Sequence, residues 1–332
     1  MTVADMSNSN TSPMPDGGKA LPRCAVVTGA GGFIGRYLAK YLGDRGCDVR
    51  GIGHSAMSEQ DSAALSLSRW YSGGISYSAL TEASQGAEII YHCAGSGSVP
   101  LSMREPMTDF RSNVVATAEV LEFSREKGGI PVVFLSTAGV YGKADTMPIR
   151  TTDPCRPISP YGVNKHIGEQ LFRQYATFFG VTGAIIRLFS VYGEGLRKQL
   201  LWDASHKLHR GDTTFFGTGE ETRDWLHVED AVSLIARVGS HADNTLPIFN
   251  GANGEKIRIR DVLETLATSY GITAPIGFTG QSRPGDPTDY CADVSASHAL
   301  GWQPSVPLDK GLARYAEWFR QDVALASTTK QI

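Results

Sequence analysis

The sequence predicts an α/β fold, a doubly wound parallel sheet followed by a smaller C-terminal lobe. Between residues 24 and 189, short apolar runs rich in β-branched residues alternate with segments whose apolar residues recur at helical spacing. This alternation is typical of parallel strands joined by crossover helices. Beyond Ser190 proline and glycine become frequent and the apolar runs shorten, which favours a second lobe that closes over a ligand.

The first strand is predicted over residues 24–28, and a glycine-rich turn and a helix follow it. Gly29, Gly32 and Gly35 have the GxxGxxG spacing, and Phe33 and Ile34 begin the helical pattern. Glycines at these places let the backbone turn sharply and bring a pyrophosphate onto the helix N-terminus. The alternative is a glycine turn that only packs helix against strand. In this context we favour a Rossmann-type site for NAD or NADP.

The second strand, predicted over residues 48–53, ends without the acidic residue that would bind an adenosine ribose 2′-hydroxyl. His54 and Ser55 stand there instead. Together with Arg36 or Arg50 they could accept a 2′-phosphate, so the sequence slightly favours NADP over NAD. The alternative is a solvated loop histidine.

Two further buried strands are predicted before the middle of the chain. The first, at residues 87–95, opens through Ala94 into a Gly-Ser loop whose backbone could approach a cofactor. The second, at residues 130–137, ends in the hydroxyls of Ser136 and Thr137. Catalytic groups in open parallel sheets gather at the carboxyl ends of strands. We therefore expect both hydroxyls to lie near one pocket, although a strand-end threonine can also serve as a helix cap.

Tyr161 and Lys165 lie four residues apart at the start of a predicted helix, so they share one face of it. Tyrosine has an ordinary pKa of about 10, and a nearby ammonium stabilises the phenolate and lowers that pKa. The pair can then move a proton on or off a hydroxyl. Taken alone, the spacing also fits an ordinary surface tyrosine and lysine.

These elements suggest three parts of the chain. Residues 1–20 are rich in Ser, Asn, Thr, Pro and Gly, and we predict a disordered tail there. We predict a Rossmann domain that binds NAD(P) over residues 21–190. A mainly substrate-binding lobe should follow over residues 191–325, with a segment at about 222–250 returning to the Rossmann domain.

The composition excludes several classes of function. The net charge is −3 and 20% of the residues are charged, so the composition does not predict binding to nucleic acid, which a positively charged protein would favour. No run of about 18 apolar residues is present, so we expect no membrane association. The five cysteines show no CxxC spacing, which favours a reduced cytoplasmic protein without a metal site.

With these motifs assembled, the chain resembles the extended short-chain dehydrogenase/reductase family, and within it the nucleotide-sugar epimerases, dehydratases and ketoreductases. It is especially similar to UDP-hexose 4-epimerases. The resemblance covers roughly residues 23–320 and rests on six motifs in the family's order. They are the sequences at residues 28–35, 113–117, 136–142, 159–165, 223–230 and 283–286.

The resemblance implies a role for each matching residue. Tyr161 would be the general acid and base, Lys165 would bind the nicotinamide ribose and keep the tyrosine pKa low, and Thr137 would polarise the same substrate oxygen. Substrate contacts would come from residues around this centre. The further implied contacts are Asn113 for the cofactor and Ser136, Ser190, Arg223 and Arg283 for the substrate.

Departures from the family pattern narrow the activity. Ala138 and Gly139 stand where dehydratases carry an acidic pair and where GDP-fucose synthases carry a cysteine. A 4,6-dehydratase or a 3,5-epimerase is therefore not expected. Ser190 replaces the usual asparagine at the substrate phosphates, so a preference for UDP does not follow from the motif.

Three functions remain open at this point. We place first an NAD(P)-dependent nucleotide-sugar epimerase that acts at C4 through a 4-keto intermediate. The alternative is an NADPH-dependent 4-reductase of nucleotide-4-keto-6-deoxysugars. A non-catalytic NAD(P)-sensing protein is the remote third. The resemblance also implies a homodimer formed by the helices of Asn113 and Tyr161, for which Val120, Phe123, Phe172 and Phe178 are available, although these side chains equally suit burial against the sheet.

Overall fold

The computed structural model describes residues 20–281 and 289–329. The tail expected over residues 1–20 lies outside the described residues except for Ala20, and Arg283 also lies outside them. In the part described, no helix combines the length and the apolar character needed to cross a membrane.

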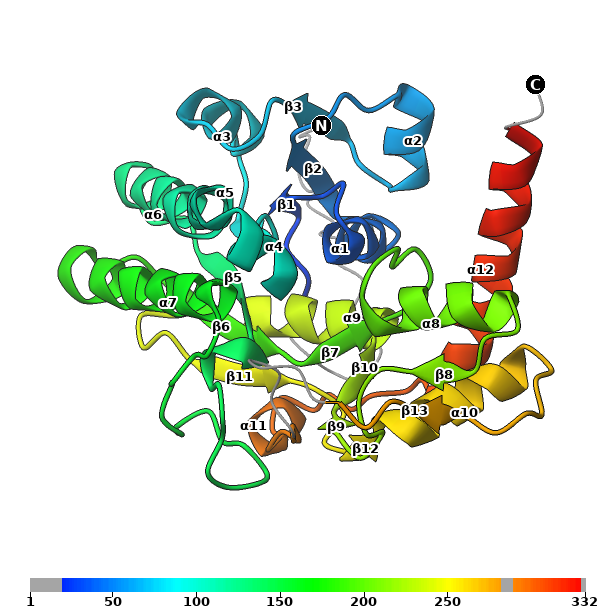
Figure 1. The fold of residues 1–332 in the computed structure, drawn as a ribbon. Coiled ribbons are helices and arrows are strands. Elements are labelled where there is room, and N and C mark those ends of the chain that lie inside the picture. Colours follow the sequence, from blue (N-terminus) through cyan, green and yellow to red (C-terminus); the bar gives the residue numbers. More distant parts are fainter. Residues whose placement is uncertain (1–19, 282–288, 330–332) are drawn as a thin grey trace.

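A seven-stranded parallel sheet forms the centre of the molecule (Figure 1). Its order is β11-β6-β5-β4-β1-β2-β3. The strands are β1 (Cys24–Thr28), β2 (Asp48–Gly53), β3 (Arg69–Ser72), β4 (Ile89–His92), β5 (Val132–Thr137), β6 (Gly183–Leu188) and β11 (Ile248–Gly251).

The direction of winding reverses between β1 and β4. From β1 the chain proceeds outward through β2 and β3, and from β4 it proceeds the other way through β5 and β6. Thr28 and His92 end the two central strands and lie side by side in register. In a doubly wound sheet the crevice at the carboxyl ends of these strands is the usual place for a ligand.

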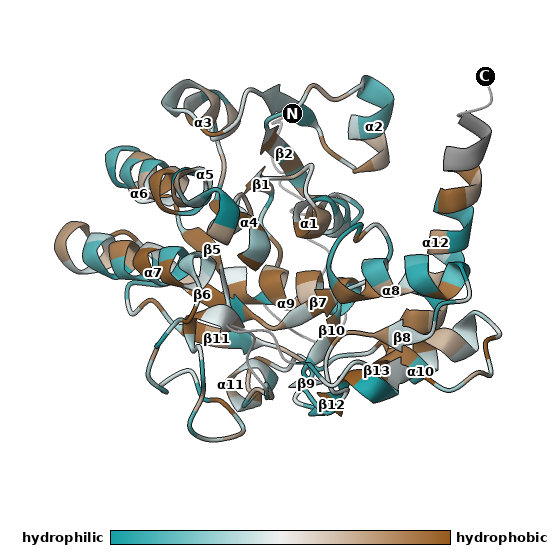
Figure 2. Ribbon diagram, viewed as in Figure 1, coloured by the Kyte–Doolittle hydropathy of each residue, from teal (hydrophilic) through white to brown (hydrophobic). Residues whose placement is uncertain are grey.

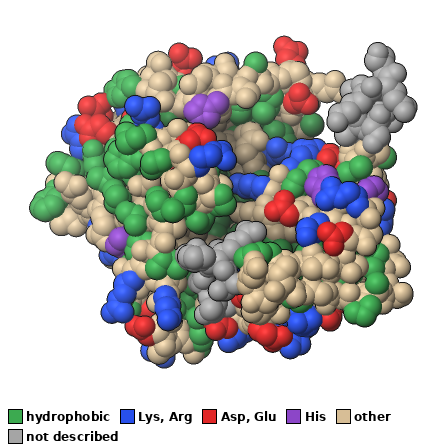
Figure 3. Space-filling model, viewed as in Figure 1, with side chains coloured by type: hydrophobic (Ala, Val, Ile, Leu, Met, Phe, Trp, Pro, Cys, Tyr) green, Lys and Arg blue, Asp and Glu red, His purple; other side chains and the backbone are tan. Residues whose placement is uncertain are grey.

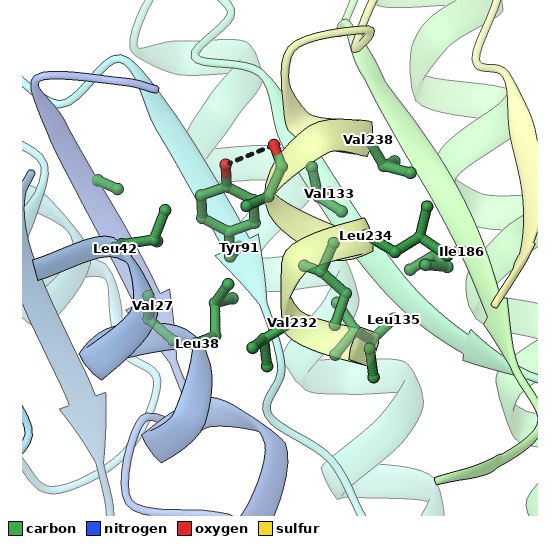
Figure 4. Packing of buried hydrophobic residues seen from close by; sticks show 14 of the residues in the cluster. Val27, Leu38, Leu42, Tyr91, Val133, Leu135, Ile186, Val232, Leu234 and Val238 are labelled. Carbon is green, nitrogen blue, oxygen red and sulfur yellow. Dashed lines mark hydrogen bonds between the residues drawn. The ribbon is translucent and has the colours of Figure 1, made fainter. Parts of the chain in front are cut away.

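Helices cover both faces of the sheet, which is why its strands are nearly continuous apolar runs. One face is covered by α1 (Phe33–Gly43) and α9 (Val228–Gly239). The other is covered by α3 (Tyr77–Ala83), α6 (Ala116–Glu126) and α7 (Pro160–Phe179). Figure 4 shows Leu38, Tyr91 and Leu234 packed between the sheet and the first pair of helices, where the Tyr91 hydroxyl donates to the Ala236 carbonyl at 3.5 Å.

Short elements connect these layers at the carboxyl edge and at the sheet margin. A π-helical turn, η1, carries Asn113 and connects α5 to α6, and such turns are frequent at functional sites. The short elements are α2 (Glu59–Ala64), α4 (Val99–Arg104), α5 (Pro106–Phe110), η1 (Arg111–Val115) and the 3₁₀ turn η2 (Ala138–Val140).

The later part of the chain builds a second lobe around a separate apolar cluster, in which Leu312, Tyr315 and Ala316 of α12 pack with residues of α8 and α10. Among the described residues it also contains three small two-stranded sheets, which pair β10 with β7, β12 with β9 and β13 with β8. Its elements are β7 (Ser190–Tyr192), α8 (Gln199–His209), β8 (Thr214–Phe215), β9 (Thr222–Arg223), β10 (Trp225–His227), β12 (Ile257–Arg258), α10 (Ile259–Ser269), β13 (Gly277–Phe278), α11 (Ser295–His298) and α12 (Leu308–Thr329).

The segment around residues 222–250 lies mostly with the first lobe. Nine of the residues of α9 are buried, and β11 is the edge strand beside β6. In Figure 2 α9 is mainly hydrophobic, as its place under the sheet requires.

One strand of the sheet differs from the sequence analysis. The edge strand β3, which runs from Arg69 to Ser72, was not among the strands predicted from the sequence. It has a single strand neighbour, β2, and its ends are exposed, so it lacks the apolar run that marked the other strands.

Candidate active site

The glycine turn after β1 is shaped by close backbone packing. Gly29 has φ +67°, and a Cβ there would lie 2.8 Å from the Ala94 backbone. A Cβ on Gly35 would collide with the Gly29 carbonyl. Gly32 caps α1 without a side chain, which leaves the first amides of the helix open toward the crevice. The turn therefore fits a pyrophosphate group.

Side chains at the end of β2 only partly match the predicted 2′-phosphate site. His54 and Ser55 are exposed, and the Ser55 carbonyl accepts a hydrogen bond from the Trp70 indole at 3.0 Å. Arg50 donates instead to the carbonyls of Ala83 and Gln85, at the opposite edge of the sheet. The prediction that Arg50 could reach a 2′-phosphate is wrong, because these carbonyls and Asp48 hold its guanidinium at the amino end of β2.

Arg36, the other arginine considered there, lies over the glycine turn. Its guanidinium donates to the carbonyls of Gly31 at 3.2 Å and Gly32 at 3.4 Å.

The loop after β4 passes between the glycine turn and α7. Gly95 has φ +144°, and a Cβ there would lie 2.6 Å from Asn113 Oδ1 and 3.3 Å from Lys165 Nζ. Asn113 is fully buried, and its Oδ1 has no hydrogen-bond partner. An unpaired buried acceptor is costly, so this atom fits a donor from a bound group, such as a ribose hydroxyl.

Tyr161 and Thr137 meet at the carboxyl edge. Helix α7 begins at Pro160, and the side chain of its cap Ser159 accepts the Gly162 amide at 3.2 Å. This fixes Tyr161 in the first turn, where its phenol lies near Thr137 at the end of β5. The Thr137 hydroxyl also caps η2, because its Oγ1 accepts the Gly139 amide at 3.1 Å. Lys165, one turn later, is buried, donates to the Leu135 carbonyl at 2.8 Å and lies 4.8 Å from the centre of the Phe134 ring.

Burial sets the protonation of this pair in the protein without cofactor. It raises the pKa of Tyr161 to about 12, although the nearby Thr137 hydroxyl lowers it in part, and the charge of Asp109 raises it further. Burial lowers the pKa of Lys165 to about 8, opposed by nearby acidic groups. The lowered tyrosine pKa expected from the sequence is therefore not found, because desolvation of the phenolate outweighs the stabilising contacts.

Two residues that the sequence analysis did not select hold this centre together. Asp109 is fully buried, and its carboxylate accepts from Asn113 Nδ2 at 3.1 Å and from Asn164 Nδ2 at 2.8 Å. It thus ties α5, η1 and α7 to one another. The spacing of four residues between Asp109 and Asn113 is a usable sequence signal, whereas the contact with Asn164 has none.

A second buried network lies behind Thr137. Ser136 donates to Glu169 Oε1 at 2.6 Å, and Arg187 holds the same carboxylate through two bonds of 2.9 and 2.7 Å. The Ser136 hydroxyl is thereby committed to Glu169, which leaves Thr137 as the hydroxyl beside Tyr161. The Ser136–Glu169–Arg187 network links β5, α7 and β6.

Comparison with known proteins identifies the group to which this arrangement belongs. The family described as "NAD dependent epimerase/dehydratase family" matches residues 25–251. The chain belongs to this family. It is 30% identical to the UDP-glucose 4-epimerase of Azospirillum brasilense, over 92% of this chain and 94% of that protein.

Solved structures of this epimerase/dehydratase family show the same fold. A UDP-glucose 4-epimerase of Thermotoga maritima with UDP-glucose has a TM-score of 0.81, at 26% identity and covering 90% of this chain and 99% of that one. A UDP-glucuronic acid 4-epimerase of Bacillus cereus, in complex with UDP-glucuronic acid and NAD, has the same TM-score, identity and coverage. The chain is therefore an extended short-chain dehydrogenase/reductase with a nucleotide-sugar epimerase fold.

The predicted substrate residues of this family member lie beyond the carboxyl edge. Ser190 begins β7, directly after β6, and donates its amide to the Asp224 carbonyl at 3.0 Å. Arg223 is half-buried, donates to the Thr222 carbonyl at 2.8 Å and lies 5.9 Å from the Tyr290 ring. Both lie at the junction of the two lobes.

Asp224 fixes this junction. Its buried carboxylate accepts the amides of Asn253 at 2.8 Å, Ala292 at 3.0 Å and Gly254 at 3.1 Å. Burial raises its pKa to about 6, and these amides oppose the rise. The carboxylate therefore holds two segments, the loop after β11 and the stretch that contains Ala292, next to Arg223.

Within the described ranges, one cluster of potential metal ligands is present, and it does not include Tyr161. Cys155, His166 and Glu169 offer donor atoms within 4.8 Å of one another, beside a surface cavity of about 630 Å³. The carboxylate is already paired with Arg187, whose positive charge opposes a cation there.

Proposed function

We propose that the protein is an NAD-dependent nucleotide-sugar 4-epimerase acting on a UDP-hexose or a UDP-hexuronic acid. The observation that carries the proposal is the placement of Thr137 beside Tyr161, one helical turn before a buried Lys165, with Ala138 and Gly139 in place of further acid or base groups. This set suffices for proton transfer at one hydroxyl. It lacks the groups needed for water elimination or for proton abstraction from carbon.

Each of these residues would have its own role in the reaction at C4. The nicotinamide would supply transfer of hydride from C4 and back to it. Tyr161 would take the proton from the C4 hydroxyl and return it after the 4-keto sugar has turned over. Thr137 would hold the same oxygen, and Lys165 would bind the ribose and favour the phenolate.

The proposed cofactor is NAD rather than NADP. The Bacillus cereus relative contains NAD, and Arg50, one of the two arginines considered for a 2′-phosphate, is held elsewhere. Denaturing the purified protein and assaying the released nucleotide tests this. Stoichiometric NAD would support recycling in place, whereas an empty site with tighter binding of NADPH than of NADH would contradict it.

The alternative activity is the NADPH-dependent 4-ketoreductase. It is favoured by one observation, the absence of an acidic side chain after β2, where His54 and Ser55 are exposed. To separate the two activities, the protein should be incubated with UDP-glucose, UDP-glucuronic acid and UDP-N-acetylglucosamine, and with 4-keto-6-deoxy nucleotide sugars. Conversion to a C4 epimer without net consumption of cofactor supports the epimerase; no change at C4 in any substrate with either cofactor would exclude both.

We also propose a homodimer that pairs α6 and α7 with their copies. Val120, Phe123 and Phe172 belong to the core and are not available for this contact. Other apolar side chains on this side of the molecule are exposed, and Figure 3 shows hydrophobic side chains gathered over these helices. They are Met103, Met107, Val115, Val163, Phe178 and Phe179.

A further inference from the structure

Arg197 and Lys198 are adjacent in the loop between β7 and α8, but they differ in whether a carboxylate lies beside them. Arg197 is paired with Asp322 and lies 5.4 Å from the Trp318 ring, so α12 neutralises its charge. Lys198 extends toward the crevice, and none of the described residues offers it a carboxylate. Among the described residues, the charge of Arg197 thus has a carboxylate partner and the charge of Lys198 has none.

The loop presents Lys198 in a fixed position. The Tyr37 hydroxyl donates to the Glu194 carbonyl at 3.0 Å, and the Tyr315 hydroxyl donates to the Leu196 carbonyl at 2.7 Å. Gln199, directly after the lysine, has φ +68°, an uncommon conformation for a residue other than glycine. Its side chain donates to the Gly97 carbonyl at 3.3 Å. Strain of this kind persists where the surroundings require it and often marks a functional position.

The ammonium of Lys198 lies against the loop that follows β4. A Cβ on Gly97 would lie 3.4 Å from Lys198 Nζ. Arg36 comes from the glycine-turn side, where a Cβ on Gly195 would lie 3.6 Å from its Nη1. Figure 3 shows basic side chains at the edge of the central hollow of this face. Two cations from different elements therefore flank the crevice where β1 and β4 end.

We propose that Lys198 binds a diphosphate group of a nucleotide held in this crevice, an inference that rests on the proposed function. The exposed ammonium of Lys198 has three donors and no acceptor, and it can offer them to an anion in the crevice. The same chemistry is offered by the diphosphate of the cofactor and by that of the nucleotide sugar. Neighbouring protein atoms also lower the pKa of Lys198, because they partly desolvate its charged form.

Equilibrium binding tests the proposal without relying on turnover. Protein stripped of nucleotide is titrated with NAD, and NAD-loaded protein is titrated with UDP and with uridine. Wild type is compared with Lys198→Gln and with Lys310→Gln, a control that removes the same charge from an exposed site on α12. We expect Lys198→Gln to weaken binding by about tenfold in one titration, as loss of a charge-assisted hydrogen bond predicts.

The two titrations separate the two sources of diphosphate. A loss for NAD assigns Lys198 to the cofactor, whereas a loss for UDP with unchanged binding of uridine assigns it to the nucleotide sugar. Lys198→Arg should restore most of the affinity, and Lys310→Gln should match wild type. Unchanged affinity of Lys198→Gln for both NAD and UDP would overturn the proposal. Failure of the protein to epimerise any sugar would refute the proposed activity, but the titrations would still show whether Lys198 binds a diphosphate.

Discussion

At the scale of single residues, the proposed chemistry turns on the phenol of Tyr161. Burial raises its pKa to about 12 in the protein without cofactor. An oxidised nicotinamide is positively charged, and a positive charge close to the phenol favours the phenolate. The tyrosine is thus a poor base until the cofactor is bound.

We therefore predict that the pKa of Tyr161 is lower with NAD bound than in the nucleotide-free protein. In nucleotide-free protein, the phenolate absorbance of Tyr161 should rise at a pH of about 12. With NAD bound it should rise at lower pH. The spectrum of Tyr161→Phe, subtracted at each pH, removes the other tyrosines. A Tyr161 pKa at or below the ordinary value of about 10 in the nucleotide-free protein would contradict the expectation.

The same residue allows a kinetic prediction. Tyr161→Phe removes the acid and base but preserves the ring, so we expect kcat to fall by roughly 10² to 10⁴, the usual contribution of general acid–base catalysis. Binding of NAD should persist. Tyr77→Phe, at an exposed tyrosine, is the matched control and should keep full activity. Equal rates for the two variants would remove Tyr161 from the mechanism.

At the scale of elements, local patterns predicted most of the first lobe. The run at residues 48–53 is the strand β2 without any shift, and α7 starts within one residue of the predicted helix because Ser159 and Pro160 form a strong local start. The strand β3 was missed because it is short and lies at the sheet edge. Its place depends on pairing with β2 rather than on its own apolar pattern.

The two faces of α7 give a stability prediction. Phe172 is fully buried between α7 and the sheet, whereas 73% of Phe178 is exposed. Phe172→Ala should lower the free energy of unfolding by about 3 to 5 kcal/mol, the usual effect of deleting a buried aromatic ring. Phe178→Ala should change it by less than about 1 kcal/mol. Denaturant unfolding measures both, and similar losses in the two variants would contradict the described orientation of the helix.

The candidate site was only partly predictable. Thr137, Tyr161 and Lys165 could be selected because a strand end and a helical spacing are local signals. Asp109, Glu169 and Arg187 were not selected, since they meet their partners across 55, 33 and 18 positions of sequence. Their effect is visible only when the elements are packed. The pKa of Tyr161 was mispredicted for the same reason, because burial cannot be derived from spacing.

At the scale of the whole molecule, the exposed apolar side chains of α7 and its neighbours predict association. Val163→Glu would place a charge in the proposed helix pairing and should shift the protein from dimer to monomer. Light scattering coupled to size-exclusion chromatography measures this. Lys310→Glu on α12 is the control on another surface. A wild-type protein that is monomeric at micromolar concentration would refute the homodimer.

The position of β11 constrains how the protein can be made. This edge strand pairs with β6, yet the whole of β7 to β10 and α9 lies between them in the sequence. During synthesis, β6, which is fully buried in the folded protein, lacks its neighbour β11 until residue 251 has left the ribosome. A chain cut at residue 190 would retain the glycine turn and Tyr161 but expose an unpaired apolar strand, which is a template for aggregation. The sheet of the first lobe can therefore be completed only after a part of the second lobe has been synthesised.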